Sequence, residues 1–334
     1  MKASFSKTIA PSLALDMTAG FATFPKELVV LGDSLSDSGN SRAVLGFFAG
    51  SFPYPRFCPI SDGVTWPVLL SQQLNTEKNL TPYARGGTNY AYVAAETVDF
   101  PLFFPVNPSI TEQVGLIPPS VNRKNPAFVF GGANDIYAYN SITNPNPGYN
   151  ATVNLGAILT SLHDLGFKYL VILNMPDIGT TPSVLGTTNA PIYTVQAGEL
   201  NKELQNQLNN IGFPVLEVDI FTLFNNILQN YQQYGFSSVT SSPSSPPYPI
   251  PGGQNTAGFA FWYDGTHFTE ATHQLISDYI FSILSGAGCY ATMAETPLQS
   301  CENKQRGFDR SSFPTSPDAS RGAAISLQTE LIRP

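Results

Sequence analysis

A serine, an aspartate and a histidine occur in this chain in the surroundings that nucleophilic catalysis requires. Ser34 follows the apolar run Val29–Leu31 on a Gly-Asp turn. Asp264 and His267 are three residues apart, directly before a helical pattern. A serine hydroxyl becomes a strong nucleophile only when an imidazole removes its proton, and a carboxylate is needed to fix the tautomer of that imidazole. The three residues therefore predict a nucleophile (Ser34), a general base (His267) and its orienting carboxylate (Asp264).

The choice of base can be made by elimination, because the chain contains only 3 histidines. His163 lies on the predicted solvent side of its helix. His273 lies inside the last predicted helix, where we expect a surface or hydrogen-bonded structural role. Taken alone, Ser34 fits a helix N-cap and Asp264 fits a turn residue, but their combination with His267 favours the catalytic interpretation.

Short apolar runs alternate with helix-period segments, which is typical of a parallel sheet covered by helices on both faces. The runs that we predict as strands are Glu27–Leu31, Asn89–Val93, Ala127–Phe130, Tyr169–Leu173 and Val215–Val218. Two stripes at helical spacing predict core-facing helices, namely Leu155, Ile158, Leu159, Leu162 and Leu165, and Ile220, Leu223, Phe224, Ile227, Leu228 and Tyr231. In open sheets of this class ligands bind beyond the carboxyl ends of the strands, and Ser34 lies just past the first.

The last predicted helix begins near Thr269, a good N-cap, with Glu270 in its first turn and Gly286 and Gly288 at its end. The proline-rich stretch Ser237–Gly253 is predicted to be an exposed loop.

Three motifs make the chain resemble the GDSL, or SGNH, family of hydrolases over residues 27–285. They are GDSL at 32–35, G-x-N-D at 132–135 and D-x-x-H at 264–267. GDSLSDSGN, GGTNYAY, LNMPDIGTTP and FWYDGTHFTEATHQ look most like the bacterial lipase and acyltransferase branch. The resemblance implies a flavodoxin-like α/β fold, a three-layer α/β/α sandwich with a mainly parallel five-stranded sheet. We expect one such domain at 27–290, after an N-terminal segment 1–26 and before a polar tail 291–334.

The same resemblance implies an oxyanion hole made of three donors, which stabilise the charge that develops on an attacked ester carbonyl. These are the backbone N–H of Ser34, the side-chain amide of Asn134 and a third N–H that the family takes from a glycine. Ala94 stands at the position of that glycine. Alanine keeps the N–H but resists positive φ, so Gly86 and Gly87 stay open as substitutes.

Two further aspartates near Ser34 are expected to be structural, because the resemblance implies that Asp33 shapes the nucleophile loop and Asp37 acts as a cap or turn. A departure from the family is Tyr263, inserted between Trp262 and Asp264, although the D-x-x-H spacing is intact.

The composition limits the partners and the compartment. The 334 residues carry a net charge of −8 and only 12% charged residues, which argues against binding to nucleic acid. No uninterrupted apolar run reaches bilayer length, so we expect a soluble protein.

The three cysteines, Cys58, Cys289 and Cys301, form no C-x-x-C pair. Cys289 and Cys301 can form a disulfide or stay free thiols. We expect the protein to be exported, with residues 1–26 as the candidate secretion signal, and a cytoplasmic location stays open as the alternative.

The resemblance implies a serine esterase or lipase acting on lipid acyl esters through an acyl-enzyme, with lysophospholipase or acyltransferase activity as further expectations. No metal or organic cofactor is implied. We expect a small-molecule or lipid ester as substrate and peripheral contact with membrane lipid. We also expect an acyl pocket shaped by the aromatic loop Phe47–Phe57, within the irregular aromatic stretch Phe47–Pro59. The alternatives are a carbohydrate O-acetylesterase and a degenerate member that binds acyl or glycan groups without turnover.

Overall fold

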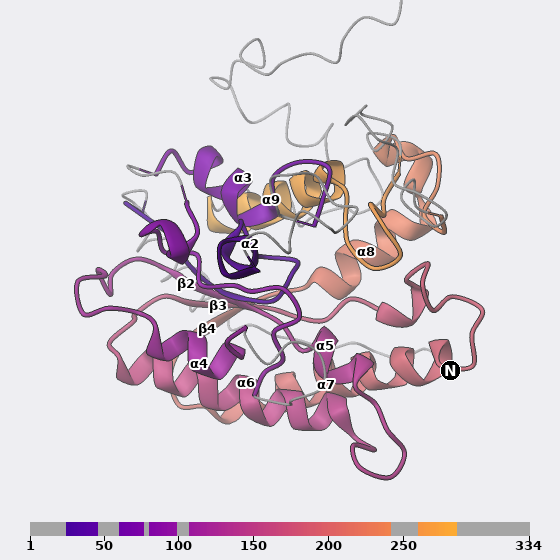
Figure 1. Cartoon of the computed structure of the whole chain (residues 1–334), viewed down its shortest axis with the longest axis horizontal. Helices are drawn as coiled ribbons and strands as arrows, with labels where there is room; N and C mark the ends of the chain where they lie inside the picture. Colours follow the sequence, from indigo (N-terminus) through magenta and orange to yellow (C-terminus); the bar gives the residue numbers. More distant parts are fainter. Residues whose placement is uncertain (1–24, 46–59, 77–79, 99–106, 242–259, 286–334) are drawn as a thin grey trace, which may run out of the picture.

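The sheet of this protein has four parallel strands in the order β1-β2-β3-β4. The computed structural model describes residues 25–45, 60–76, 80–98, 107–241 and 260–285. The strands are β1 (Val29–Gly32), β2 (Ala127–Phe130), β3 (Leu170–Leu173) and β4 (Val215–Val218). Every residue of β1, β2 and β3 is buried, as expected for a parallel sheet with both faces covered (Figure 1).

The fifth predicted strand, Asn89–Val93, does not form a regular strand. Three backbone hydrogen bonds place it beside β1, from Val30 to Thr88, from Tyr90 to Val30 and from Tyr92 to Gly32. A parallel ladder would continue with a bond from the Gly32 N–H to the Tyr90 carbonyl. The side chain of Gln113 accepts that N–H instead, at 2.8 Å. The pairing is therefore interrupted where β1 leads into the Ser34 turn.

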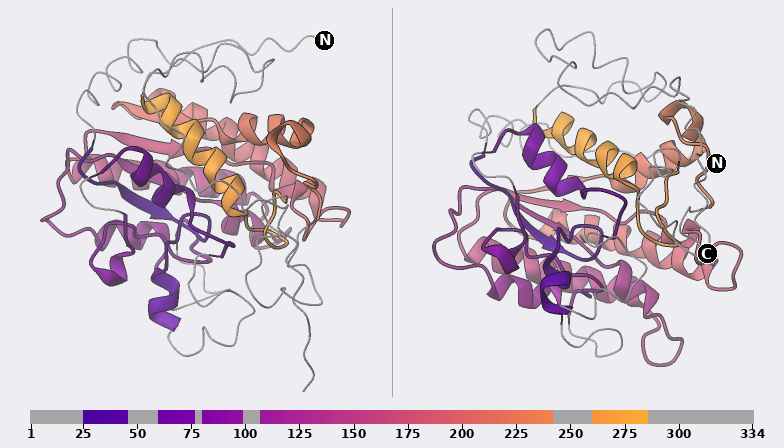
Figure 2. Two further views of the ribbon diagram at one scale, coloured as in Figure 1. Left: turned by 90° about the horizontal axis from the view of Figure 1, so that it is seen from above. Right: turned by 45° about the horizontal axis from the view of Figure 1, so that its top comes forward.

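Helices cover both faces of the sheet, which confirms the predicted α/β fold. One face carries α4 (Ile110–Gly115), α5 (Ala133–Tyr137), α6 (Pro147–Asp164) and α7 (Ala190–Asn210). The other face carries α3 (Trp66–Gln73), α8 (Ile220–Gln229) and α9 (Glu270–Leu284). Figures 1 and 2 show the two helical layers with the sheet between them. The shorter elements are α2 (Asn40–Leu45), η2 (Tyr83–Arg85), η3 (Ile178–Thr180) and η4 (Tyr231–Tyr234).

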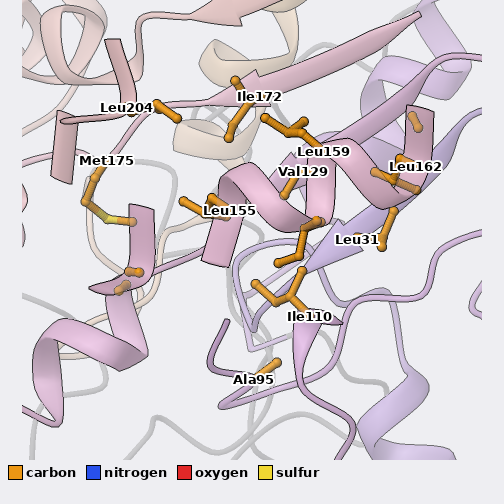
Figure 3. Close-up of a cluster of buried hydrophobic side chains, with 14 of the residues drawn as sticks. Leu31, Ala95, Ile110, Val129, Leu155, Leu159, Leu162, Ile172, Met175 and Leu204 are labelled. Carbon is orange, nitrogen blue, oxygen red and sulfur yellow. The ribbon is translucent and has the colours of Figure 1, made fainter. Parts of the chain in front are cut away.

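Two apolar cores follow from the alternation of side chains along the strands. Val29 and Leu31 of β1 point into the core under α6 and α7, part of which is drawn in Figure 3. Leu28 and Val30 point into the opposite core, under α3, α8 and α9.

The predicted helical stripes are buried except at their C-terminal ends. In α6, Leu155, Ile158, Leu159 and Leu162 are at most 1% exposed, whereas Leu165 is 41% exposed. Leu165 is the C-cap of the helix, so it lies past the last turn that packs on the sheet. In α8 the stripe is buried up to Ile227, and Leu228 and Tyr231 pack partly buried against the same core.

Helix α9 begins as predicted, because the hydroxyl of Thr269 accepts the backbone N–H of Thr272 and caps the first turn. His273 contradicts the expectation of a surface or hydrogen-bonded role. Its side chain is 1% exposed and lies edge-on to the ring of Phe268. Its Nδ1 has no hydrogen-bond partner within the described residues. Burial lowers the pKa of His273 to about 3, with a smaller contribution from the charge of His267.

This burial predicts a stability that depends on pH. The unfolded chain protonates His273 near its ordinary pKa of about 6.5, while the folded protein does not until about 3. His273 by itself therefore removes about 2 kcal/mol of stability between pH 7.5 and 5, because over this range only the unfolded chain protonates it. The raised pKa values of Asp33, Asp135 and Glu217 act in the opposite direction, so the contribution of His273 is measured as a difference between variants. In urea unfolding, the stability of His273→Leu relative to wild type should rise by about 2 kcal/mol from pH 7.5 to pH 5. His163→Leu, at a side chain that is 43% exposed, is the matched control and should not show this rise. A stability difference between His273→Leu and wild type that is the same at both pH values would contradict the prediction.

Several expectations fall outside the described residues. These are the segment 1–24, the aromatic stretch Phe47–Pro59, the three cysteines, Gly286 and Gly288, and the tail 291–334. Of the loop Ser237–Gly253, only residues 237–241 are described. None of the helices in the described part of the chain combines the length and hydropathy needed to cross a membrane.

Candidate active site

The structure brings Ser34, His267 and Asp264 into one hydrogen-bonded chain. The His267 Nε2 lies 2.9 Å from the Ser34 Oγ. The His267 Nδ1 lies 2.8 Å from the Asp264 Oδ2. Ser34 is 8% exposed, and the side chains of His267 and Asp264 are 15% and 14% exposed, so the three groups are shielded but reachable. This geometry allows His267 to take the Ser34 proton while Asp264 holds the opposite ring nitrogen.

The turn that carries Ser34 is held by Asp33. One side-chain carboxylate oxygen of Asp33 accepts the N–H of Leu35 at 2.9 Å. The backbone carbonyl of Asp33 accepts the N–H groups of Ser36 and Asp37. Asp33 is buried, and burial raises its pKa to about 7. Asp37 accepts three backbone N–H groups at the start of α2, from Gly39, Asn40 and Ser41, so it acts as a cap. The structure thus places both aspartates in structural positions.

A local turn fixes Asp264 against His267. The Oδ1 of Asp264 accepts the backbone N–H groups of Thr266 and His267 at 2.7 and 2.6 Å, which directs Oδ2 to the imidazole. Burial alone would raise the pKa of Asp264, but the charge of His267 and these hydrogen bonds hold it below its ordinary value. Asp264 is therefore ionised near neutral pH. The insertion of Tyr263 does not disturb the turn, since the Tyr263 N–H donates to the carbonyl of His267 at 2.8 Å.

Asn134 lies in the first turn of α5, two residues after Gly132. Gly132 has a φ of 111°, and a Cβ at this position would lie 2.8 Å from the side chain of Leu200. One N–H of the Asn134 amide donates to the carbonyl of Ala95 at 3.0 Å. The amide is thereby tied to the residue that follows Ala94, so two of the predicted oxyanion donors belong to adjoining loops.

Ala94 adopts the conformation that its residue type resists. Its φ is 59°, in the left-handed region. The position that the family gives to glycine thus keeps a glycine-like backbone. Gly86 and Gly87 do not substitute for it, because their N–H groups close the turn around η2 by donating to Tyr83 and Pro82. The expectation that either could replace Ala94 is wrong.

Ala94→Gly should therefore stabilise the protein by about 0.5–1 kcal/mol, since glycine meets no steric penalty at positive φ. We expect kcat/KM for an ester to stay within about threefold of wild type, because the N–H is retained. Ala94→Val should destabilise the protein and lower kcat, since a β-branched residue tolerates this φ poorly. Thermal unfolding and steady-state kinetics test both variants. A large fall of activity in Ala94→Gly would show that the alanine methyl, not the N–H, matters.

Two supports of the site were missed by sequence reasoning. The carboxylate of Asp135 accepts both the N–H and the hydroxyl of Thr97, three residues after Ala94. Burial raises the pKa of Asp135 to about 6. On the other side, the N–H of Ser183 donates to the carbonyl of Gly265 at 2.9 Å. Asp135 belongs to the G-x-N-D motif and was detectable there, whereas no sequence signal marked Ser183.

Several known proteins are similar to this chain in sequence. The sequence model of the family described as GDSL-like Lipase/Acylhydrolase matches residues 28–280. Esterase EstA of Pseudomonas aeruginosa is 25% identical over 327 aligned residues, which cover 83% of this chain and 50% of EstA. An acetylesterase of Thermothelomyces thermophilus is 25% identical over 303 aligned residues, covering 80% of this chain and 95% of that enzyme.

The chain spans about half the length of EstA and of an uncharacterised Pseudomonas putida relative, at 50% and 57% of their residues. Among solved structures, the native M. smegmatis aryl esterase matches with a TM-score of 0.43 and 14% identity, covering 78% of this chain and 99% of that one.

Proposed function

This chain belongs to the GDSL-like lipase/acylhydrolase family, and from that premise we propose that it is a serine esterase that cleaves carboxylic esters through an acyl-enzyme. The observation that carries the proposal is the Ser34–His267–Asp264 chain, with distances of 2.9 and 2.8 Å. Asp264 is ionised and faces the His267 nitrogen remote from Ser34, as the reaction requires.

In the proposed first step, His267 removes the Ser34 proton as the Ser34 Oγ attacks the ester carbonyl carbon. The carbonyl oxygen becomes an oxyanion, which accepts hydrogen bonds from the N–H groups of Ser34 and Ala94 and from the Asn134 amide. His267 then gives its proton to the leaving alcohol, and the acyl group stays on Ser34.

In the second step, water attacks the acyl-enzyme with His267 again as base, and the carboxylic acid leaves. An alcohol in place of water would give transfer of the acyl group, which we include as a proposed side activity. Neither step requires a metal or an organic cofactor.

We propose lipid acyl esters, including lysophospholipids, as the substrate class, on the resemblance of four motifs to the lipase and acyltransferase branch. Such a substrate would bring the protein into peripheral contact with membrane lipid, and an exported location would suit it.

The second candidate is a short-chain O-acetylesterase. It is favoured by the acetylesterase relative, since the match extends over 95% of that enzyme. The positive φ of Ala94 counts against the non-catalytic alternative, because the only motive for that alternative was the doubtful geometry of this donor.

Hydrolysis of p-nitrophenyl esters from acetate to palmitate, and of lysophospholipid, tests the proposal. A rate that rises beyond about eight carbons supports the lipid class, while a rate confined to acetate and propionate supports the acetylesterase. Failure of purified protein to hydrolyse any of these esters faster than a Ser34→Ala control would contradict the esterase proposal.

A further inference from the structure

The short helix α4 contacts each of the three segments that carry the proposed oxyanion donors. These segments are the Ser34 turn, the loop around Ala94 and the Gly131–Asn134 loop. They come from different parts of the chain. Backbone pairing brings Gly32 beside Phe130 and Tyr92, and α4 adds contacts of its own to all three segments.

The contact with the Ser34 turn is made by Gln113. Its Oε1 accepts the N–H of Gly32 at 2.8 Å, and its Nε2 donates to the carbonyl of the same residue at 2.9 Å. Gln113 thus bonds both backbone polar groups of Gly32, two residues before Ser34, and the Gly32 carbonyl also accepts the Tyr92 N–H at 3.1 Å. Gln113 is fully buried, so water cannot take over these bonds.

The contact with the second segment is made by the start of the helix. The N–H of Ile110 donates to the carbonyl of Glu96 at 2.9 Å, and the N–H of Thr111 donates to that of Thr97 at 3.1 Å. The Thr111 hydroxyl donates to the same Thr97 carbonyl at 2.7 Å. Glu96 and Thr97 lie two and three residues after Ala94, so α4 holds the loop in which Ala94 keeps its positive φ.

The contact with the third segment is a packing contact. A Cβ on Gly131 would lie 2.1 Å from the Ile110 side chain, so this glycine lets the Asn134 loop close over Ile110. Figure 3 shows Ile110 in one apolar cluster with Leu31 and Ala95. The helix is itself fixed by a capping box, in which Ser109 and Glu112 exchange side-chain to backbone hydrogen bonds of 3.3 and 3.0 Å.

We propose that Gln113 is a positioning residue for ester hydrolysis, which holds the backbone before Ser34 in register with the Ala94 and Asn134 donors. This inference rests on the proposed esterase function. Gln113 touches no reacting atom, so its loss changes the alignment of the oxyanion hole and leaves Ser34, His267 and Asp264 in place.

Gln113→Met tests the proposal, because methionine has a similar volume and makes neither hydrogen bond. A shift of about 1 Å in a reacting group can cost a hundredfold in rate, so we expect kcat to fall about 10- to 100-fold while KM changes less than about threefold. Gln196→Met is the matched control. Gln196 is also buried, and its Oε1 accepts the Gly148 N–H at 3.0 Å between α7 and α6. It should lower the melting temperature but keep kcat.

Gln113→Glu supplies a readout that loss of stability alone would not change. The introduced carboxyl, when protonated, can still accept from the Gly32 N–H and donate to its carbonyl, whereas an ionised carboxylate repels that carbonyl. Burial raises the pKa of a carboxyl, so the ratio of variant to wild-type kcat should fall as the pH rises. The ratio removes any pH dependence that both proteins share. A low ratio that stays flat with pH, or equal kcat losses in Gln113→Met and Gln196→Met, would overturn the proposal.

The rate of Ser34 labelling by an alkyl fluorophosphonate separates this inference from the proposed function. Labelling also develops charge in the oxyanion hole but needs no ester substrate. Slow labelling of Gln113→Met beside normal labelling of Gln196→Met supports the positioning role, even if the wild type hydrolyses none of the esters tried. Equal labelling of the two variants counts against it.

Discussion

Replacement of Ser34 by alanine should lower kcat for ester hydrolysis by about 10⁴- to 10⁶-fold, to the rate that oxyanion stabilisation and binding alone can support. The Ser34 Oγ is the group that lies 2.9 Å from the His267 Nε2, so no other described hydroxyl has this access to the base. Burst kinetics with a p-nitrophenyl ester should show one acyl group per active wild-type molecule and no burst in the variant.

Ser277→Ala is the matched control for this substitution. Ser277 is also buried, and its hydroxyl donates to the Gln73 side chain at 2.7 Å between α9 and α3. The control should lose about 1 kcal/mol of stability and keep its activity. Residual activity of Ser34→Ala within about tenfold of wild type would exclude Ser34 as the nucleophile.

Replacement of Asp264 by asparagine should lower kcat by about 10³- to 10⁴-fold with little change in stability. The N–H groups of Thr266 and His267 both point to the Oδ1 of residue 264, so they force the new amide to place its oxygen there. Its NH₂ group then faces the His267 Nδ1. That nitrogen must become the acceptor, and the proton moves to Nε2, where it blocks removal of the Ser34 proton.

Steady-state kinetics across pH and the labelling rate of Ser34 measure this loss. Asp177→Asn is the control, because Asp177 caps η3 in a similar turn, with its Oδ1 accepting the Gly179 N–H at 3.0 Å. It should keep its activity. An Asp264→Asn enzyme within tenfold of wild type would mean that another group orients His267.

The strands β1, β2 and β3 could be predicted from sequence because each is a short apolar run that is buried on both faces, and β4 is buried at alternate residues. The edge segment Asn89–Val93 also contains tyrosine and valine, which favour strands, and its failure to form one was not predictable. Gln113, which lies 81 residues from Gly32 in sequence, takes the hydrogen bond that the ladder needed. The composition of a segment indicates which secondary structure it can form. A competing hydrogen-bond partner elsewhere in the chain can prevent that structure from forming.

The same distinction applies to His273 and Ala94. Helical periodicity placed His273 in the last helix but did not show that the Phe268 ring and the core would enclose it. The preference of alanine for negative φ is a local rule, which tertiary contacts of the neighbouring residues override at Ala94. Glu96 and Thr97 are held by hydrogen bonds to α4 and Asp135, which fix the chain just after Ala94.

The sequence by itself determined the residue types of the site and the short-range part of its geometry. Asp264 and His267 are three residues apart, so one turn with two backbone hydrogen bonds sets their distance. Only the tertiary structure decided that His267 meets Ser34 across 233 residues, and that α4 joins the loops of Gly32, Ala94 and Asn134. Contacts within a turn follow from spacing along the chain. The long-range contacts depend on strand order and on which side chains form the buried hydrogen bonds.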